Sequence, residues 1–318
     1  MTLSELDLSH TRAVVVGDLM LDCNVWGATD RVSPEAPVVV VRVESRTNRP
    51  GGAANTAANM ASLGAQVSVV GAVGADAEAT LLTDSLLSLG LDVSGLIVSA
   101  DRPTTTKTRF YAQNQQLLRT DSESTVPLSD DIRSQVVAHA LAQIDQVDVV
   151  VLSDYAKGVM SESVCAEVIG AARAAGRPVL VDPKGRNYLK YRGASVITPN
   201  LEELRRAVNA DLHSDDDVIA AGRDLATELG EDTVILVTRG ADGMTLIDGA
   251  GTHHIPTAAR AVFDVTGAGD TVLATLGVAL AAGADIRSAA ELANRAAAIV
   301  VGRVGTAVVT RDELLGHP

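Results

Sequence analysis

Residues 264–271 read DVTGAGDT and lead into an apolar helix, which places two glycines and a carboxylate at a helix start. Gly267 and Gly269 allow the backbone to approach a ligand closely, and the unpaired N–H groups of a helix start can bind a phosphoryl group. Asp270, in the first turn, can accept a proton from an attacking hydroxyl. Phosphoryl transfer needs little else beyond positioning and charge neutralisation. A plain loop before an acidic helix start would look the same, so the neighbouring motifs must decide.

A second glycine pair, Gly51 and Gly52, precedes a helix of small residues. Two glycines ahead of a helix again expose backbone N–H groups to a ligand. Asn55, in the first turn of that helix, offers both a donor and an acceptor to sugar hydroxyls. A tight connection from a strand to a helix is the alternative interpretation of this segment.

Two further segments are candidates for the nucleotide side of a kinase site. The turn that contains Thr238, Gly240 and Gly243 follows a buried strand and suits contact with a nucleotide, although it would suit a hairpin equally well. Asn200 and Glu203 stand three residues apart at a helix start, so both can face the water shell of a magnesium–phosphate complex. An ordinary helix N-cap with an acidic first turn is the other interpretation.

The rest of the chain alternates short apolar runs with longer amphipathic segments. The predicted strands are 13–16, 67–70, 147–152, 178–181, 194–197 and 233–237, and the predicted helices are 53–63, 77–89, 129–142, 161–175, 201–208, 215–229, 268–282 and 288–302. This alternation predicts a mostly parallel sheet with helices on both faces. Residues 22–45 and 102–121 instead alternate polar and apolar side chains, which predicts half-exposed strands that form a lid. No linker or internal repeat divides the chain, so we expect one domain over residues 1–318.

Composition narrows the class of partner. The 318 residues carry a net charge of -14, which argues against nucleic acid and anionic membranes as partners. Aromatic residues make up only 2% of the chain, so Ala, Val and Leu must build the core. Cys23 and Cys165 show no pairing pattern, and the N-terminal sequence lacks the features of a signal peptide. We therefore expect a soluble, cytoplasmic protein with reduced thiols.

These motifs, in this order, resemble those of the PfkB (ribokinase-like) carbohydrate kinases: GGAAN at 51–55, NLEE at 200–203, the glycine turn at 238–243 and DVTGAGDT at 264–271. The resemblance implies a ribokinase-like three-layer α/β/α sandwich with a β-sheet lid, and ATP and Mg²⁺ as cofactors. It implies that Asp270 is the general base and that the N–H groups of Gly267, Ala268 and Gly269 form an anion hole. It implies that the sugar is held by Asp22, Gly51, Gly52 and Asn55. Asp264 and Thr266 match positions that bind a monovalent cation, such as K⁺, in many members.

A narrower resemblance links the chain to the heptose-7-phosphate kinases. It rests on GDLMLD at 17–22, SPEAPV at 33–38, NQQLLR at 114–119, SDYAKG at 153–158, VDPKG at 181–185 and VGTAV at 304–308. Those enzymes phosphorylate the anomeric hydroxyl of D-glycero-D-manno-heptose 7-phosphate on the route to nucleotide-activated heptose and lipopolysaccharide. The resemblance adds Asp18, Asn114 and Gln116 to the expected substrate-binding residues.

The chain departs from the heptose-7-phosphate kinases in two respects. Cys23, Asn24 and Gln113 differ from the usual residues at the expected sugar pocket or lid, which leaves another sugar open as the substrate. The H-x-G-H element of the nucleotidyltransferase domain that is often fused to these kinases is missing from the sequence. We therefore expect another protein to carry out the nucleotidyl transfer.

Basic residues on the predicted lid support a phosphorylated substrate independently. Lys107, Arg109 and Arg119 gather there in an otherwise acidic chain, and Lys157 follows a strand end. A dianionic phosphate needs such groups, and arginine can bind it through two parallel hydrogen bonds. A solvated basic face on an edge strand is the alternative.

Two more residues complete the predicted nucleotide site. Lys184 is a candidate for contact with the phosphates, and Asn294 is a candidate for contact with the adenine or, alternatively, a polar core residue. The exposed edges of the predicted lid, together with the lid-to-lid dimers of the family, predict a homodimer.

The sequence disfavours three other functions. A kinase for an unphosphorylated sugar is disfavoured by the basic lid, and a catalytically silent sugar-binding protein is disfavoured by the intact Asp270, Asn200 and Glu203. A dinucleotide-dependent oxidoreductase is disfavoured because the first strand ends in Gly17-Asp18 without the G-x-G-x-x-G turn.

Overall fold

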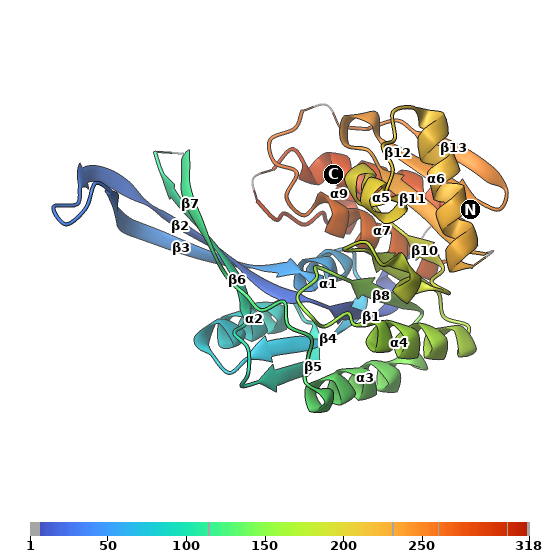
Figure 1. Cartoon of the computed structure of the whole chain (residues 1–318), viewed down its shortest axis with the longest axis horizontal. Helices are drawn as coiled ribbons and strands as arrows, with labels where there is room; N and C mark the ends of the chain where they lie inside the picture. The colour runs from blue at the N-terminus through green and yellow to red at the C-terminus, as the bar shows by residue number, and fades with distance from the viewer. Residues whose placement is uncertain (1–6, 114, 231, 260, 304, 317–318) are drawn as a thin grey trace.

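The computed structural model of the chain describes residues 7–113, 115–230, 232–259, 261–303 and 305–316. Its main element is a nine-stranded sheet in the order β13-β12-β11-β10-β9-β8-β1-β4-β5 (Figure 1). The strands are β1 (Arg12–Gly17), β4 (Gln66–Gly74), β5 (Asp92–Ser99), β8 (Val149–Ser153), β9 (Val179–Asp182), β10 (Val196–Ile197), β11 (Val234–Thr238), β12 (Met244–Asp248) and β13 (Gly251–Ile255). Only the β11–β12 and β12–β13 pairs are antiparallel in the described part of this sheet, and the other pairs are parallel.

Helices cover both faces of this sheet and bury its apolar side chains in two separate cores. One face packs against α1 (Ala53–Ser62), α2 (Ala77–Ser88), α7 (Ala268–Ala281), α8 (Ile286–Val300) and α9 (Arg311–Leu315). The other packs against α3 (Asp130–Ile144), α4 (Glu162–Ala174), α5 (Leu201–Val208) and α6 (Asp215–Leu229). Successive strand residues alternate between the two cores, as Val14 and Val15 do. The continuous apolar runs of the sequence therefore belong to strands that are buried on both faces.

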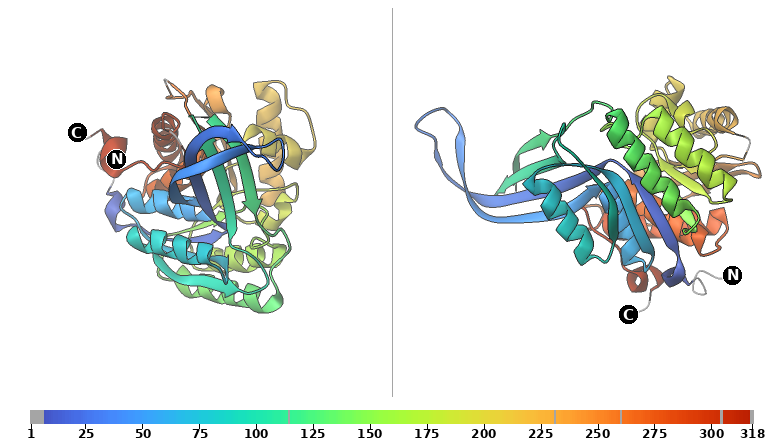
Figure 2. Two further views of the ribbon diagram at one scale, coloured as in Figure 1. Left: turned by 90° about the vertical axis from the view of Figure 1, so that its left-hand side faces the viewer. Right: turned by 90° about the horizontal axis from the view of Figure 1, so that it is seen from below.

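A second sheet of four strands stands beside the first, in the order β3-β2-β6-β7. Its strands are β2 (Leu19–Val32), β3 (Val39–Gly52), β6 (Thr105–Ala112) and β7 (Gln115–Ser122). The β2–β3 hairpin projects far from the main sheet (Figures 1 and 2). Trp26 and Tyr111 stack across neighbouring strands with their ring centroids 4.3 Å apart, which stiffens the sheet.

The structure confirms the predicted alternation of strands and helices, and each predicted strand and helix has its counterpart. Three strands were not predicted, namely β5, β12 and β13. The extra sheet was expected at 22–45 and 102–121, but β3 continues to Gly52, so the glycine pair at 51–52 ends a strand and leads directly into α1. No helix within the described residues is long and apolar enough to cross a membrane.

Candidate active site

The starts of α1 and α7 meet beside the carboxyl end of β8, and they bring Asp270 and Asn55 together. Asp270 is 3% exposed. Asn55 donates from Nδ2 to Asp270 Oδ2 over 2.7 Å, and Thr56 donates from Oγ1 to Oδ1 over 3.1 Å. The Tyr155 hydroxyl also donates to Oδ1, over 2.7 Å. Three donors from two distant segments therefore hold one buried carboxylate.

Burial raises the pKa of Asp270 to about 6, against the lowering effect of the hydrogen bonds from Asn55, Tyr155 and Thr56. The nearby Asp22 carboxylate raises this pKa further. A carboxylate with a pKa near 6 is ionised at neutral pH, yet it is a stronger base than an exposed aspartate. Such a group suits general-base chemistry.

The glycine loop before α7 is shaped by close contact with Asn55. Gly267 has a φ of 78°, and a Cβ at this position would lie 2.8 Å from Asn55 Nδ2. The predicted anion hole needs one correction, because the Ala268 N–H donates to the Val265 carbonyl oxygen over 3.1 Å. Around Gly269 no atom of the described residues, outside its chain neighbours and the backbone of its own helix, would lie within 4 Å of a Cβ, so a ligand can approach its backbone.

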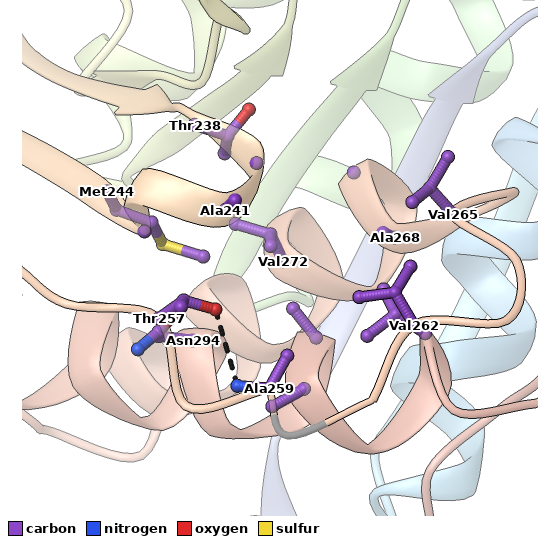
Figure 3. A pocket seen from close by; sticks show the side chains of 16 residues that line it. Thr238, Ala241, Met244, Thr257, Ala259, Val262, Val265, Ala268, Val272 and Asn294 are labelled. Carbon is purple, nitrogen blue, oxygen red and sulfur yellow. Dashed lines mark hydrogen bonds between the residues drawn. The ribbon is translucent and has the colours of Figure 1, made fainter.

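Beside this loop lies a cavity of about 380 Å³ (Figure 3). It is bounded by the turn between β11 and β12, by Thr257, Ala259, Val262 and Val265, and by helices α7 and α8. The predicted residues Thr238, Gly240, Gly243 and Asn294 all line it, together with apolar side chains such as Met244 and Val272. The Asn294 amide donates to the Pro256 carbonyl oxygen over 2.8 Å, so it holds the wall of the cavity. A mostly apolar slot next to a glycine-rich helix start suits a nucleotide whose planar base lies in the slot and whose phosphates reach the loop.

Asn200 and Glu203 form the helix N-cap that the sequence offered as the alternative to a magnesium–phosphate site. Asn200 Oδ1 accepts from the Glu203 N–H over 2.9 Å, and Glu203 Oε2 accepts from the Asn200 N–H over 3.0 Å. Glu203 Oε1 accepts from Lys184 Nζ over 2.6 Å. Nearby, burial raises the pKa of Asp182 well above 3.8, and the Asp270 and Glu203 carboxylates add to that effect.

The His, Cys, Asp and Glu side chains of the described residues limit how a divalent cation could be held. Within the described residues, no group of three or more His, Cys, Asp or Glu could hold a metal ion. A magnesium ion would therefore take most of its ligands from phosphates and water. Such a coordination shell is common for this ion.

Asp264 and Thr266, the expected monovalent-cation residues, form a turn of their own. Asp264 Oδ1 accepts from the Thr266 N–H over 2.9 Å and from its hydroxyl over 2.7 Å, and Oδ2 accepts from the Gly305 N–H over 2.8 Å. Burial opposes ionisation of Asp264, but these hydrogen bonds outweigh it and lower its pKa. This carboxylate joins the glycine loop to the turn after α8.

On the four-stranded sheet, Asp22 lies in the site and is 7% exposed. Its Oδ1 pairs with Arg109 Nη1 at 2.6 Å, and a Cβ at Gly51 would lie 2.5 Å from its Oδ2. Lys107 is adjacent, and burial lowers its pKa against the opposite effect of Asp22. Lys157 pairs with Glu123 at 2.7 Å.

Further along this sheet, the predicted residues are less enclosed. The half-exposed Arg119 pairs with Asp121 on its own strand, over 2.9 Å. Gln116 is exposed, and Asn114 lies outside the described residues.

Asp18 was predicted to bind the substrate, but in the structure its carboxylate binds the protein itself. Asp18 is 1% exposed and accepts hydrogen bonds from the N–H groups of Tyr155, Lys157 and Val159, at 2.8, 3.0 and 3.1 Å. It therefore anchors the loop after β8. Conversely, the contacts of Tyr155 and Thr56 with Asp270 were missed. Tyr155 lies inside the SDYAKG segment at 153–158, but nothing in that segment assigns the tyrosine hydroxyl.

Comparison with known proteins gives a consistent result. The profile of the pfkB family carbohydrate kinases matches residues 10–312. The bifunctional protein HldE of Helicobacter hepaticus is 46% identical over 312 residues, which cover 98% of this chain and 64% of that protein. HldE of Shewanella baltica is 49% identical over 305 residues, which cover 96% of this chain and 63% of that protein. The chain thus spans somewhat less than two thirds of the length of these relatives.

Solved structures establish the fold. Arabidopsis thaliana ribokinase complexed with ribose and ATP superposes with a TM-score of 0.75 at 21% identity, over 96% of this chain and 98% of that one. Escherichia coli phosphofructokinase-2 in complex with fructose-6-phosphate gives 0.77 at 18% identity, over 97% of each chain. The predicted ribokinase-like three-layer α/β/α sandwich with a small additional sheet is confirmed.

Proposed function

This chain belongs to the pfkB family of carbohydrate kinases, and we propose that it transfers the γ-phosphate of ATP to D-glycero-D-manno-heptose 7-phosphate. The acceptor is the anomeric hydroxyl, and the product is the 1,7-bisphosphate. The observation that carries the kinase proposal is Asp270, a buried carboxylate with a pKa of about 6 at a glycine-flanked helix start. The heptose assignment is supported by the six motif segments and by the similarity to the HldE proteins over nearly the whole chain.

The two oxygens of Asp270 have different roles in this mechanism. Oδ1 accepts hydrogen bonds from Thr56 and Tyr155, whereas among the described residues Oδ2 accepts only from Asn55. Oδ2 therefore keeps a lone pair for the acceptor hydroxyl, and it takes the proton as the sugar oxygen bonds to the γ-phosphorus. The bond from that phosphorus to the bridging oxygen breaks, and ADP leaves. The unpaired N–H groups at the start of α7 stabilise the charge that develops on the transferred group.

The nucleotide occupies the cavity between α7, α8 and the β11–β12 turn. Its base lies against the apolar wall near Met244 and Val272, and its phosphates extend toward Gly269. Lys184, beside Glu203, contributes a positive charge near the phosphates. Magnesium, when bound, neutralises phosphate charge, and a monovalent cation such as K⁺ would bind near Asp264 and Thr266.

The phosphate of the sugar binds on the four-stranded sheet, which acts as a lid. Lys107 is half-buried, and within the described residues it makes no ion pair or hydrogen bond through its ammonium group. Burial lowers its pKa, so an arriving phosphate would supply the partner that this charge lacks. Arg109 and Lys157 supply further positive charge at this end of the site. ATP and sugar phosphates are cytoplasmic metabolites, which supports a cytoplasmic location. The nine-stranded sheet with the four-stranded sheet beside it supports a single kinase domain with its lid.

A second copy of the chain is the proposed partner of the lid. The strands at the two edges of this sheet, β3 and β7, are exposed along most of their length. They carry exposed apolar side chains such as Val39 and Leu118, which are 56% and 55% exposed. Light scattering should give twice the chain mass for the wild type and a lower mass for Leu118→Glu. A wild type that is monomeric at micromolar concentration would exclude the dimer.

The function is tested by ATP turnover with Mg²⁺ against heptose 7-phosphate, fructose phosphates, ribose and fructose. Asp270→Asn should abolish turnover, whereas Asp285→Asn should not, because Asp285 is the N-cap of α8 and asparagine caps helices equally well. Turnover of heptose 7-phosphate alone would support the full proposal. Turnover of a different sugar would retain the kinase and remove the heptose assignment. Sugar binding without any turnover would favour a catalytically silent protein.

A further inference from the structure

Tyr155 is one of the two donors to Asp270 Oδ1 that the sequence did not assign, and Thr56 is the other. The Tyr155 hydroxyl lies 2.7 Å from Asp270 Oδ1. Burial raises the pKa of Tyr155 well above 10, and the Asp270 and Asp182 carboxylates raise it further. The phenol therefore keeps its proton throughout the working pH range and can only donate to this carboxylate.

The loop that carries Tyr155 is held by a buried acid beneath it. Asp18 accepts hydrogen bonds from three N–H groups of this loop, including that of Tyr155 itself. The next residue, Ala156, has a φ of 55°, a left-handed conformation that costs a residue with a side chain about 1 kcal/mol or more. A strained residue persists only where the surrounding contacts over-determine it. The loop is therefore built to hold one backbone conformation.

The other side of the loop is equally fixed. Asp154 is 1% exposed and accepts from the Ala156 N–H, from Lys190 Nζ and from the Tyr191 hydroxyl, at 2.7, 2.5 and 2.7 Å. Tyr155 thus lies between two buried carboxylates, Asp18 and Asp154, whose partners are mostly backbone N–H groups. Such an arrangement gives the ring little freedom to leave Asp270.

This loop also contacts the base of the lid. Lys157 pairs with Glu123, which directly follows β7, at 2.7 Å. Arg102, which precedes β6, donates from Nη2 to the carbonyl oxygens of Lys157, Ser124 and Val126, at 2.7, 3.2 and 3.1 Å. The segment that places the tyrosine is therefore connected to both ends of the β6–β7 hairpin.

We propose that Tyr155 is a positioning residue for the general base. Together with Thr56 it occupies Oδ1 of Asp270, so that the carboxylate cannot rotate and Oδ2 faces the acceptor hydroxyl. Without the phenol, Oδ1 would keep only the longer bond from Thr56, and either oxygen could turn toward the substrate. This inference rests on the proposed function, because it assigns the role of a residue in that same site.

Tyr155→Phe removes the hydroxyl and keeps the ring. Tyr188→Phe is its matched control, because the Tyr188 hydroxyl is buried and has no hydrogen-bond partner within the described residues. We expect Tyr155→Phe to lower kcat by about tenfold, with KM for ATP unchanged, since a hydrogen bond to a charged group is lost from the reacting centre. Tyr188→Phe should keep the wild-type kcat.

The pH dependence separates positioning from a merely structural role. The phenol lowers the pKa of Asp270, so its removal should move the acidic limb of kcat/KM to higher pH. Two other carboxylates face Asp270, namely Asp22 on β2 and Asp182 on β9. Both are unchanged in Tyr155→Phe and in Tyr188→Phe. A structural defect would lower the fraction of active enzyme and leave the acidic limb of kcat/KM at its wild-type pH.

A second measurement does not depend on turnover. In protein with ¹³C-labelled aspartate carboxyls, the NMR titration of Asp270 should shift to higher pH in Tyr155→Phe and stay in place in Tyr188→Phe. An unchanged titration together with an unchanged kcat would overturn the proposal. If the wild type phosphorylated no sugar, the proposed function would fail, and the titration would still decide whether Tyr155 acts on Asp270.

Discussion

Gly267→Ala isolates the contact between the glycine loop and the residues that hold the base. The backbone at Gly267 is left-handed, with a φ of 78°, and an alanine Cβ there would lie 2.8 Å from Asn55 Nδ2. That distance is shorter than any relaxed contact between a carbon and a nitrogen. Either Asn55 or the loop must therefore move, and Asn55 is the residue that donates to Asp270 Oδ2.

Gly267→Ala carries two separate free-energy costs, which set the expected losses of stability and of kcat. A left-handed conformation for alanine costs about 1–2 kcal/mol of stability. Displacement of Asn55 weakens its 2.7 Å hydrogen bond to the Asp270 carboxylate, and a bond of this kind contributes roughly 1.5–3 kcal/mol. If the transition state loses that amount, kcat falls by about 10- to 100-fold.

Gly283→Ala supplies the control, because it carries the first cost without the second. Gly283 follows the other end of α7 with a φ of 90°, and no atom of the described residues, outside its chain neighbours, would lie within 4 Å of its Cβ. Urea denaturation should show a loss of about 1–2 kcal/mol for Gly283→Ala and a larger loss for Gly267→Ala, which also weakens the Asn55 hydrogen bond, and turnover should fall only in Gly267→Ala. If Gly267→Ala kept the wild-type kcat while its stability fell as in the control, the contact with Asn55 would have no catalytic role.

Three further outcomes are expected. Below a pH of about 6, kcat/KM should fall about tenfold per pH unit as Asp270 takes up a proton, and it should level off above that pH. Lys184→Met should raise KM for ATP by roughly tenfold, and urea denaturation should show a loss of about 1–2 kcal/mol, because Lys184 is half-exposed but the Glu203 carboxylate that loses its cation is buried. Asp264→Asn should cost about 1 kcal/mol at neutral pH, where Asp264 is ionised and hydrogen-bonded. In the folded protein the pKa of Asp264 lies below 3.8, so ionised Asp264 contributes its full stabilisation above that pH. The difference in unfolding free energy between Asp264→Asn and the wild type should shrink as the pH falls through this lowered pKa.

The sequence predicted the parts of the site that depend on local backbone features. The two glycine segments were identifiable because each precedes a helix of small residues. The family resemblance then assigned Asp270 and Asn55, which lie 215 residues apart, to one site. The buried strands were identifiable because apolar runs of four to six residues fit strands that are covered on both faces. The unpredicted strands β5 and β13 lie at the two edges of the sheet and are partly exposed, so their patterns are weak. Strand β12 is buried inside the sheet, but Thr245 interrupts its short apolar run.

What the sequence could not predict depends on contacts between distant loops. Asp18 stands at the end of a central strand, where a ligand residue is expected, but the N–H groups of a loop 137 to 141 residues away occupy its carboxylate. The Ala268 N–H is turned toward Val265 by the local course of the glycine loop, which sequence spacing does not reveal. Tyr155 reaches Asp270 from that same loop, which Asp18 anchors and which takes a left-handed turn at Ala156.

The balance at Asp270 explains why so many polar residues are buried around it. Burial excludes water from the reacting centre, but it also disfavours the ionised carboxylate and raises its pKa. Without these donors, the pKa would rise further, and a smaller fraction of the proposed base would be ionised at neutral pH. The hydrogen bonds from Asn55, Thr56 and Tyr155 oppose that effect and hold the pKa near 6. Asn59 donates to the Asn55 side-chain oxygen over 3.3 Å, so the Asn55 Nδ2 group is turned toward the base. The buried polar network is therefore the condition under which a dry site can retain an ionised base.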